Sequence, residues 1–549
     1  MASGVNLSPA KGLHRRKGGS SLVWAPALLA GAAVLLPVVY LVIRALGAGA
    51  EAWELLLRWR TLEIAGRTVL LAATVTVGTA LIAVPLAWLT VRSDLPLRRL
   101  WAVLTTLPLA IPSYVGAMVV VAALGPRGLV QQIVGQPLGI ERLPEVYGFP
   151  GAAATLMLLS FPYVLLSVRG ALWGLDPALE EAGRTLGYSR WGAFRRVTLP
   201  LLRPAIVAGG LLVALYTLSD FGAVSLLRYE TLTWAIYLQY EATFDRAVAA
   251  ALSLILILMA VTVLGLEAWS KGRGHYYGSS ARAFLQSGPV PLGPWRWPAV
   301  AFCLVVVAFS VALPLAILGY WLVRGLAGSE ALVSLLRPAV GSVVVASLAA
   351  AAAVVAAFPV ARVMTRFPGP LSGILGVVTY SGFALPGIVV ALALVFFSVR
   401  FAYPVYQSLS LLVFAYVVLF LAPAIGAIKA SLLQVSPRVE EAARTVGAGP
   451  WRVFARVTLP LAAPGFLSAG ALVFLVTVKE LPATLLLSPP GFKTLATTVW
   501  SASSAGFFAQ AAAPALLLVL ASGVVMAFLI ARGGKVSSQG VTRGDVPIR

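Results

Sequence analysis

The chain has 549 residues, of which 60% are hydrophobic and only 11% are charged, and its mean hydropathy is +0.93, so it is not a soluble globular protein and is expected to cross a membrane many times. Its net charge of +22 does not indicate nucleic-acid binding, because the lysines and arginines lie in short segments between apolar runs and form no basic domain. One cysteine and two histidines exclude an intrachain disulfide and a metal site built from His and Cys ligands.

Twelve apolar segments are long enough for transmembrane helices, because about 20 apolar residues cross the hydrocarbon core. They lie near 22–43, 68–91, 101–124, 150–173, 205–227, 247–268, 298–322, 342–365, 373–397, 409–431, 465–487 and 510–531. We therefore expect an all-α membrane protein of 12 transmembrane helices in two parallel six-helix repeats. Its parts are an N-terminal tail (1–21), a first half (22–268), a linker (269–297), a second half (298–531) and a C-terminal tail (532–549).

A polar and basic segment occurs once in each half, 260 residues apart. The copies read EEAGRTLGYSRWGAFRRVTLPLLRP over residues 180–204 and EEAARTVGAGPWRVFARVTLPLAAP over residues 440–464. Residues 180–227 and 440–487 agree at 23 of 48 positions without a gap. Two membrane halves with the same hydrophilic loop are expected of a device that is worked by two copies of a soluble partner.

The repeat extends upstream of these loops at an offset of 274 residues. The aligned pairs are Pro85 with Pro359, Arg92 with Arg366, and Pro112 with Pro386. The basic tails, the 92–99 loop, the linker and both repeated loops all fall on one side, which the positive-inside rule makes the cytoplasm. Both termini are therefore expected to be cytoplasmic, and the parallel repeats place a pathway between the halves.

Each repeated loop is predicted to form a helical hairpin. A capping oxygen and a proline mark its start, two glutamates follow, and a glycine suits the left-handed residue that ends the helix. A second short helix would carry an aromatic pair on one face. These residues are Asp176, Pro177, Glu180, Glu181, Gly187, Trp191 and Phe194, and in the second copy Ser436, Pro437, Glu440, Glu441, Gly447, Trp451 and Phe454. One such hairpin could simply anchor at lipid headgroups, but two at equivalent positions favour docking.

Two acidic residues, Asp220 and Glu480, end the predicted fifth helix of each half and align at the same 260-residue offset. A carboxylate in a membrane segment is costly and defaults to a functional hypothesis. This pair could face the pathway and attract a cation. Alternatively, each could cap a helix end or pair locally, as Glu480 could with Lys479.

At the repeated loops the chain resembles the permease subunits of binding-protein-dependent ATP-binding cassette importers. The loop of that family runs Glu-Ala-Ala, three residues, Gly and, after a spacer, Leu-Pro. Residues 441–460 match fully, and residues 181–200 match with Gly183 in place of an alanine. The matching residues are Glu181, Ala182, Gly187, Leu199 and Pro200, and in the second copy Glu441, Ala442, Gly447, Leu459 and Pro460. The resemblance covers roughly residues 67–531.

This resemblance implies a type I importer-like permease fold in a bacterial plasma (inner) membrane, with the loops as coupling helices. It implies two copies of a cytoplasmic ATP-binding cassette ATPase as partners, and a periplasmic or lipid-anchored solute-binding protein. The chain has no GxxxxGK[ST] phosphate loop, so we expect ATP on the partner subunits, no cofactor on this chain and no enzymatic activity of its own.

Residues 219–224, 479–487 and 491–497 look like the ferric-iron branch of these permeases, in which two fused halves are characteristic. Fe(III) is a hard cation that prefers oxygen ligands, which suits acidic residues. Related permeases for thiamine, polyamines, phosphonates, sulfate or molybdate share much of the pattern.

Two other classes fit the sequence less well. A secondary transporter of two six-helix halves would carry a Gly…Asp-Arg…Gly-Arg loop, which residues 92–99 do not match, and proton coupling would need more buried acids or histidines. A membrane enzyme would need a nucleophile elbow or metal-ligand spacing, and neither occurs.

Overall fold

The computed structural model describes residues 21–47, 54, 58–126, 128–132, 145–243, 246–271, 289–327 and 335–542. Almost all of the predicted N-terminal tail, most of the linker and the last residues of the C-terminal tail lie outside these ranges. Within them the chain is helical, and its one isolated β-bridge joins Ser93 to Val290. Among the described residues, ten helices are long and apolar enough to span a membrane, or up to twelve if each of two bent pairs is counted as one span.

The first half runs from α1 to α12. Its helices are α1 (Ser21–Leu46), α3 (Trp59–Arg92), α4 (Arg98–Leu104), α5 (Ser113–Leu124), α6 (Phe149–Gly174), α7 (Pro177–Thr185), α8 (Arg190–Ala193), α9 (Leu199–Ser219), α10 (Gly222–Leu226), α11 (Leu232–Leu238) and α12 (Arg246–Lys271). Packing of α3, α6 and α9 against one another forms the centre of this half.

The second half repeats this order. Its helices are α13 (Arg296–Val307), α14 (Leu313–Ala327), α15 (Leu336–Arg366), α16 (Pro370–Ser381), α17 (Gly387–Phe401), α18 (Leu409–Gln434), α19 (Pro437–Thr445), α20 (Pro450–Val453), α21 (Leu459–Val478), α22 (Pro482–Leu487), α23 (Leu495–Ser504) and α24 (Phe508–Thr542). Here α15, α18 and α21 pack together, as their counterparts do in the first half. The prediction of an all-α fold with two repeats is confirmed.

The third predicted helix of each half is not straight. The segments 98–110 and 113–124 meet at 93°, and the segments 370–384 and 387–401 meet at 102°. The aligned prolines Pro112 and Pro386 stand at these bends in extended conformation. A proline cannot donate a helical hydrogen bond, and it disfavours a helical residue before it. Hydropathy alone could not reveal these bends because both arms are apolar.

The fifth predicted helix of each half is also interrupted. The segments 205–227 and 465–487 were expected to be continuous, but α9 ends at Ser219 and α21 ends at Val478. The chain then turns at the predicted acidic residues and continues as short helices, α10 and α11 in the first half and α22 and α23 in the second. The acids therefore lie at helix breaks inside the bundle.

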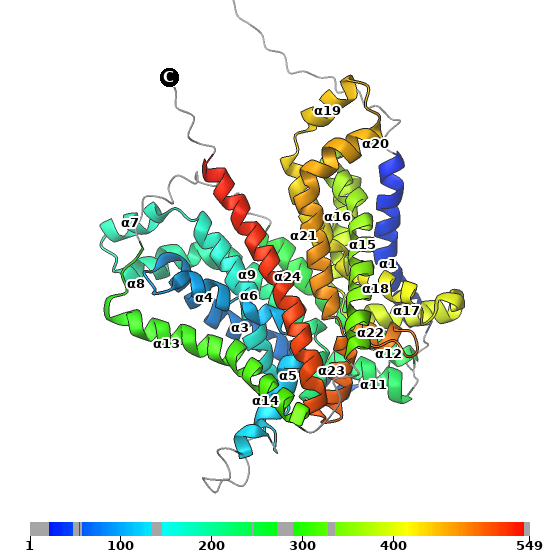
Figure 1. The fold of residues 1–549 in the computed structure, drawn as a ribbon, viewed down its shortest axis with the longest axis horizontal. Helices are drawn as coiled ribbons and strands as arrows, with labels where there is room; N and C mark the ends of the chain where they lie inside the picture. The colour runs from blue at the N-terminus through cyan, green and yellow to red at the C-terminus, as the bar shows by residue number, and fades with distance from the viewer. Residues whose placement is uncertain are drawn as a thin grey trace, which may run out of the picture.

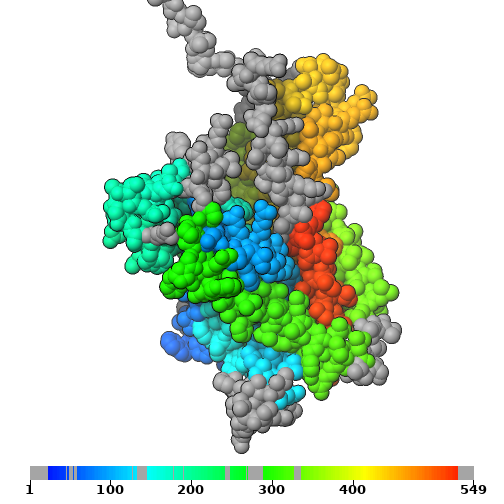
Figure 2. All heavy atoms as spheres, turned by 60° about the vertical axis from the view of Figure 1, so that its left-hand side comes forward, coloured from blue at the N-terminus to red at the C-terminus, as the bar shows by residue number. Residues whose placement is uncertain are grey.

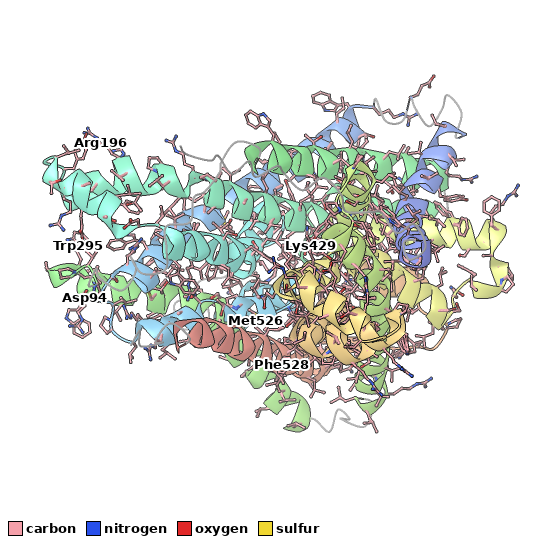
Figure 3. The ribbon with its side chains drawn as sticks, turned by 90° about the horizontal axis from the view of Figure 1, so that it is seen from above. Asp94, Arg196, Trp295, Lys429, Met526 and Phe528 are labelled. Atoms are coloured by element: carbon pink, nitrogen blue, oxygen red, sulfur yellow. The ribbon has the colours of Figure 1, made fainter. Side chains whose placement is uncertain are left out.

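The first helix of each half packs on the other half. α1 lies against α15, α16 and α17, while the buried side of α13 joins the core of the first half through Ala299, Cys303 and Val306. The chain that enters α13 is fixed there, because the Leu292 N–H donates to Asp94 at 2.8 Å. Figure 3 shows Asp94 and Trp295 at the same edge of the molecule as Arg196. The halves are thereby interlocked.

The two hairpins lie at one end of the molecule. Figure 1 shows α7 and α8 on one side of this end and α19 and α20 on the other, with α24 ending at the same end. In Figure 2 the two hairpins protrude at separate places on the surface. The short helices α5, α22 and α23 lie toward the opposite end, where the two halves meet (Figure 1).

Candidate functional site: paired hairpins and a central cavity

The first hairpin begins and ends as predicted. The Asp176 side chain accepts a hydrogen bond from the Ala178 N–H at 2.9 Å, and Pro177 begins α7. Gly187 ends the helix with φ +90°, a conformation that favours glycine. The Gly187 N–H donates to the Arg184 carbonyl and the Tyr188 N–H to the Gly183 carbonyl, which is the Schellman pattern.

The second hairpin has the same ending but a different start. Gly447 has φ +83°, and the two hydrogen bonds of the Schellman pattern recur at Gly447 and Ala448. Ser436, predicted as the capping side chain, makes no side-chain cap hydrogen bond. Pro437 begins α19, so the start rests on the fixed proline φ alone.

The predicted second short helix of each hairpin is not separate. α8 and α20 pass through five-residue π-helical turns, 194–198 and 454–458, directly into α9 and α21. Pro200 and Pro460 follow these turns. A proline cannot donate to the carbonyl four residues before it and would clash with it, so a wider turn relieves the conflict. The hairpin therefore continues without a loop into a membrane helix, which begins at Leu199 in one half and Leu459 in the other.

The outer faces of the hairpins present aromatic and acidic groups. Trp191 is 70% exposed and Trp451 is 74% exposed, and each ring lies 5.5 Å from the phenylalanine three residues later. The predicted docking residues Glu181, Ala182, Glu441 and Ala442 are also exposed. Tryptophan is enriched at protein-binding surfaces, so the two exposed rings favour the docking interpretation.

The other glutamate of each pair faces the bundle. Glu180 accepts a hydrogen bond from the Thr198 hydroxyl at 3.2 Å, and Glu440 accepts one from Thr458 at 3.1 Å. These bonds join the first helix of each hairpin to its π-helical turn. Glu440 is buried and is also paired with Arg366 at 3.4 Å.

Two arginines at the ends of long helices hydrogen-bond to the backbone just before each hairpin. Arg92 donates to the Leu175 carbonyl at 2.7 Å, and Arg366 donates to the Val435 carbonyl at 2.8 Å, in each case just before the hairpin. The sequence repeat had aligned these arginines without assigning them a role. That alignment is the signal that could have identified them.

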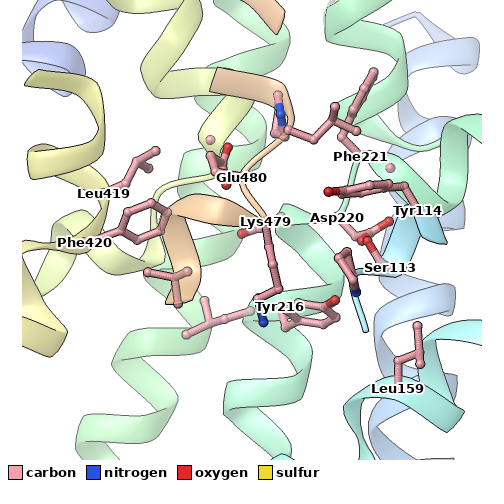
Figure 4. A pocket seen from close by; sticks show the side chains of 18 of the residues that line it. Ser113, Tyr114, Leu159, Tyr216, Asp220, Phe221, Leu419, Phe420, Lys479 and Glu480 are labelled. Carbon is pink, nitrogen blue, oxygen red and sulfur yellow. The ribbon is translucent and has the colours of Figure 1, made fainter. Parts of the chain in front are cut away.

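A cavity of about 360 Å³ lies between the halves, away from the hairpins. Residues from α5, α6 and α9 line one side and residues from α17, α18 and α21 line the other. Both predicted pathway acids, Asp220 and Glu480, are part of the lining, as is Lys479 (Figure 4). The two carboxylates are therefore brought to one space by the pseudo-symmetry of the halves.

Each acid also caps a short helix. Asp220 Oδ1 accepts from the Ala223 N–H at 2.9 Å at the start of α10, and Glu480 Oε1 accepts from the Ala483 N–H at 3.2 Å at the start of α22. Each carboxylate thus caps a short helix and also lines the cavity. A helix start also favours a carboxylate through its dipole.

Lys479 does not pair with its neighbour. Its Nζ donates to the Leu109 carbonyl of the first half at 2.8 Å, and no ion pair with Glu480 occurs among the described side chains. Within the described residues there is also no group of three or more His, Cys, Asp or Glu that could hold a metal ion. A cation in this cavity would have to use oxygens of other side chains.

Comparison with known proteins places this architecture in a family. A family model described as "Binding-protein-dependent transport system inner membrane component" matches residues 80–273 and again residues 351–532. The two matches contain the two hairpins and the two cavity acids. Together they span more than half of the chain.

Individual relatives agree with this match. The chain is 33% identical over 509 residues, 90% of its length, to the Fe(3+)-transport system permease protein FbpB 2 of Haemophilus influenzae, of which 95% is covered. It is 34% identical over 189 residues to the molybdenum transport system permease protein ModB of Escherichia coli, covering 33% of this chain and 81% of the relative. It is 28% identical over 253 residues to the sulfate transport system permease protein CysT of the same organism, covering 45% and 88%.

Proposed function

Because the chain belongs to the family of binding-protein-dependent transport system inner membrane components, and is thus a multi-pass permease of an ATP-binding cassette importer, we propose that its cargo is ferric iron. The relative that matches nearly the whole chain is named for Fe(3+) transport. The cavity between the halves offers two carboxylates, Asp220 and Glu480, and a hard trivalent cation prefers oxygen ligands.

The observation that carries the mechanism is the pair of equivalent hairpins. Each is a surface helix that is hydrogen-bonded to a π-helical turn and continues into a membrane helix. We propose that one copy of a cytoplasmic ATPase binds each hairpin and carries the ATP. Movement of the ATPases then passes through α9 and α21 to the cavity, and both chain termini lie on this cytoplasmic side.

A solute-binding protein is proposed to deliver the ion on the opposite face, above the short helices α11 and α23. The permease itself then needs no high affinity, because the binding protein selects the cargo. The chain contributes the passage and the coupling, and ATP hydrolysis remains on the partner subunits.

An oxyanion is the second candidate cargo. The shorter relatives are named for molybdenum and sulfate transport, and the ammonium of Lys479 in the cavity lining is a cation that would attract an anion. Against it stand the two carboxylates in the same lining, which would repel an anion.

The test is transport in vesicles that contain the permease with its two ATPase subunits and its binding protein. Uptake of radiolabelled Fe(III) should require ATP and the binding protein and should be unaffected by excess molybdate or sulfate. ATP-dependent uptake of radiolabelled molybdate or sulfate, with no uptake of iron, would assign the oxyanion instead. Uptake that persists without ATP and follows an ion gradient would contradict the importer mechanism.

A further inference from the structure

The two walls of the central cavity differ in chemistry. The wall from the first half carries hydroxyl groups and the carboxylate of Asp220, whereas the wall from the second half has no hydroxyl group and is hydrocarbon apart from Lys479 and Glu480. Figure 4 shows Ser113, Tyr114 and Asp220 on one side and Leu419 and Phe420 on the other. A pathway between two related halves is thus lined unequally.

The sequence repeat shows which positions differ. Four hydroxyl-bearing lining residues of α5, α6 and α9 have a counterpart without a polar side chain in the second half, whereas the fifth, Ser219, aligns with Lys479. The pairs are Ser113 with Gly387, Tyr114 with Ile388, Tyr163 with Pro423, and Tyr216 with Val476. Because the second half builds the same bends and the same helices without these hydroxyl groups, the fold does not need them.

Among these residues, Tyr114 has a hydroxyl group whose presence the fold does not explain. Its ring is buried, and its hydroxyl group is buried without a hydrogen-bond partner among the described residues. A buried hydroxyl without a partner destabilises a protein by about 1–3 kcal/mol, so such a group calls for an explanation. Gly222 makes room for this ring, since a Cβ there would lie 2.7 Å from the Cβ of Tyr114.

The other oxygen-bearing side chains of this wall line the same cavity as Tyr114. They include Ser113, Tyr216 and Asp220 (Figure 4). The ring of Tyr216 lies 5.6 Å from that of Tyr163. Both backbone hydrogen bonds to the Asp220 side chain end on Oδ1. Phenol, hydroxyl and carboxylate oxygens from α5, α9 and the break after α9 are therefore concentrated on one wall.

We propose that the first-half wall is a transient binding site for Fe(III) in transit, with the phenol oxygens of Tyr114 and Tyr216 and the carboxylate of Asp220 as its ligands. The inference rests on ferric iron being the cargo and adds where the ion is held. Each phenol that binds exchanges its O–H bond for an O–Fe bond and releases the proton to water, and the iron stays Fe(III) throughout.

Lys479 reaches across the cavity from the second half to the first. Its ammonium donates to the Leu109 carbonyl, so a positive charge lies at the edge of the first-half wall. The carboxylate of Asp220 opposes this charge when the wall holds a cation. Because all proposed ligands belong to the first half, no bond between the ion and the second half has to break when the halves move apart. The ion then becomes accessible and can be released.

The test compares Tyr114→Phe/Tyr216→Phe with Tyr416→Phe in the complete transporter. Tyr416 is buried outside the cavity lining, and its hydroxyl is paired with Thr484 at 2.6 Å. Loss of a metal ligand should lower ATP-dependent Fe(III) uptake by about tenfold or more in the double variant. Tyr416→Phe, which loses a satisfied hydrogen bond, should lower the thermal stability more than Tyr114→Phe but leave uptake close to wild type.

A binding measurement tests the proposed site independently of the proposed cargo. The purified transporter in lipid nanodiscs is titrated with ferric nitrilotriacetate, and tyrosine-to-Fe(III) charge-transfer absorption is recorded in the visible range. The band should appear in the wild type and in Tyr416→Phe and be lost in the double variant. Iron uptake by a double variant at the wild-type rate, or no band in a wild type that imports iron, overturns the site and leaves the cargo standing. If the wild type imports no iron, the cargo proposal fails, and absence of the band then rejects the site as well.

Discussion

Glu440 is the most heavily paired side chain of the two hairpins. It accepts from Thr458, and its carboxylate lies 3.4 Å from Arg366 and 3.8 Å from Arg362 and Arg444. Only 7% of its side chain is exposed, so these pairs are little screened by solvent. Its counterpart Glu180 has the threonine bond but is less buried.

Replacing Glu440 with glutamine should therefore destabilise the second hairpin. An amide keeps one hydrogen bond but leaves the positive charges of Arg362 and Arg366 without their buried partner. We expect a loss of about 2 kcal/mol, measured as earlier thermal unfolding and faster proteolysis between α18 and α21.

The neighbouring carboxylate provides the matched control. Glu441→Gln changes an exposed side chain, so stability should remain at the wild-type level while ATPase stimulation changes through the docking surface. Equal stability of Glu440→Gln and Glu441→Gln would show that the ion pairs around Glu440 do not hold the hairpin.

At the scale of elements, each hairpin depends on one glycine that sets the angle between its two helices. Gly187 and Gly447 have positive φ values, and a Cβ at either would meet no atom within 4 Å. A side chain therefore fits the space, and only the backbone opposes it, at about 1–2 kcal/mol for each residue. Gly187→Val/Gly447→Val should reorient α7 and α19, so that iron uptake is lost while the protein still inserts into the membrane.

Gly449 serves as the control because it lies in the same hairpin with φ −65° and open space around it. Gly449→Val should keep uptake near the wild-type rate. Uptake and ATPase activity are measured together, because uncoupling predicts ATP hydrolysis without transport. Full uptake by a well-inserted double variant would contradict this role for the two glycines.

The elements that could be predicted are those with a local signal. Glycine at a helix end, Pro177 at a helix start and apolar length each fix a local conformation, and the repeat confirms each signal by a second occurrence. The bends at Pro112 and Pro386 were missed because both arms of each bent pair satisfy the same apolar pattern. The breaks after α9 and α21 were missed for the same reason, although Asp220 and Glu480 marked where they fall.

Site geometry was predictable only where the repeat made two positions equivalent. The repeat indicated that Asp220 and Glu480 occupy equivalent positions, and the structure places both at one cavity. The repeat could not show that the hydroxyl-bearing side chains lie on the first-half wall. Tyr114 and Tyr216 lie in apolar helices about 100 residues apart, and only packing of α5 against the break after α9 brings them together. Nor could it show that Lys479 bonds across the halves to Leu109.

At the scale of the whole molecule, the halves make contact at the end opposite the hairpins. α23 packs against α5 and α10, and Trp500 Nε1 donates to the Ser225 hydroxyl at 3.4 Å. The Trp500 ring also lies 6.0 Å from the rings of Phe221 and Tyr237. If the ATPases draw the hairpins together, rigid-body rocking of interlocked halves must separate this aromatic contact.

A reversible cross-link tests this motion. Cys303 is the one cysteine of the sequence, so Cys303→Ser gives a background in which Ser225→Cys and Trp500→Cys are the reactive pair. A short bifunctional thiol reagent should join them in the state without ATP, and trapping the ATPases in their closed form should reduce the yield. Iron uptake should stop when the link is made and return when a reductant removes it, because the outer ends of the halves must part in every cycle. Each single-cysteine variant treated with the reagent controls for modification alone, and uptake that continues at full rate through the intact link would rule out a rocking motion with its opening at α23.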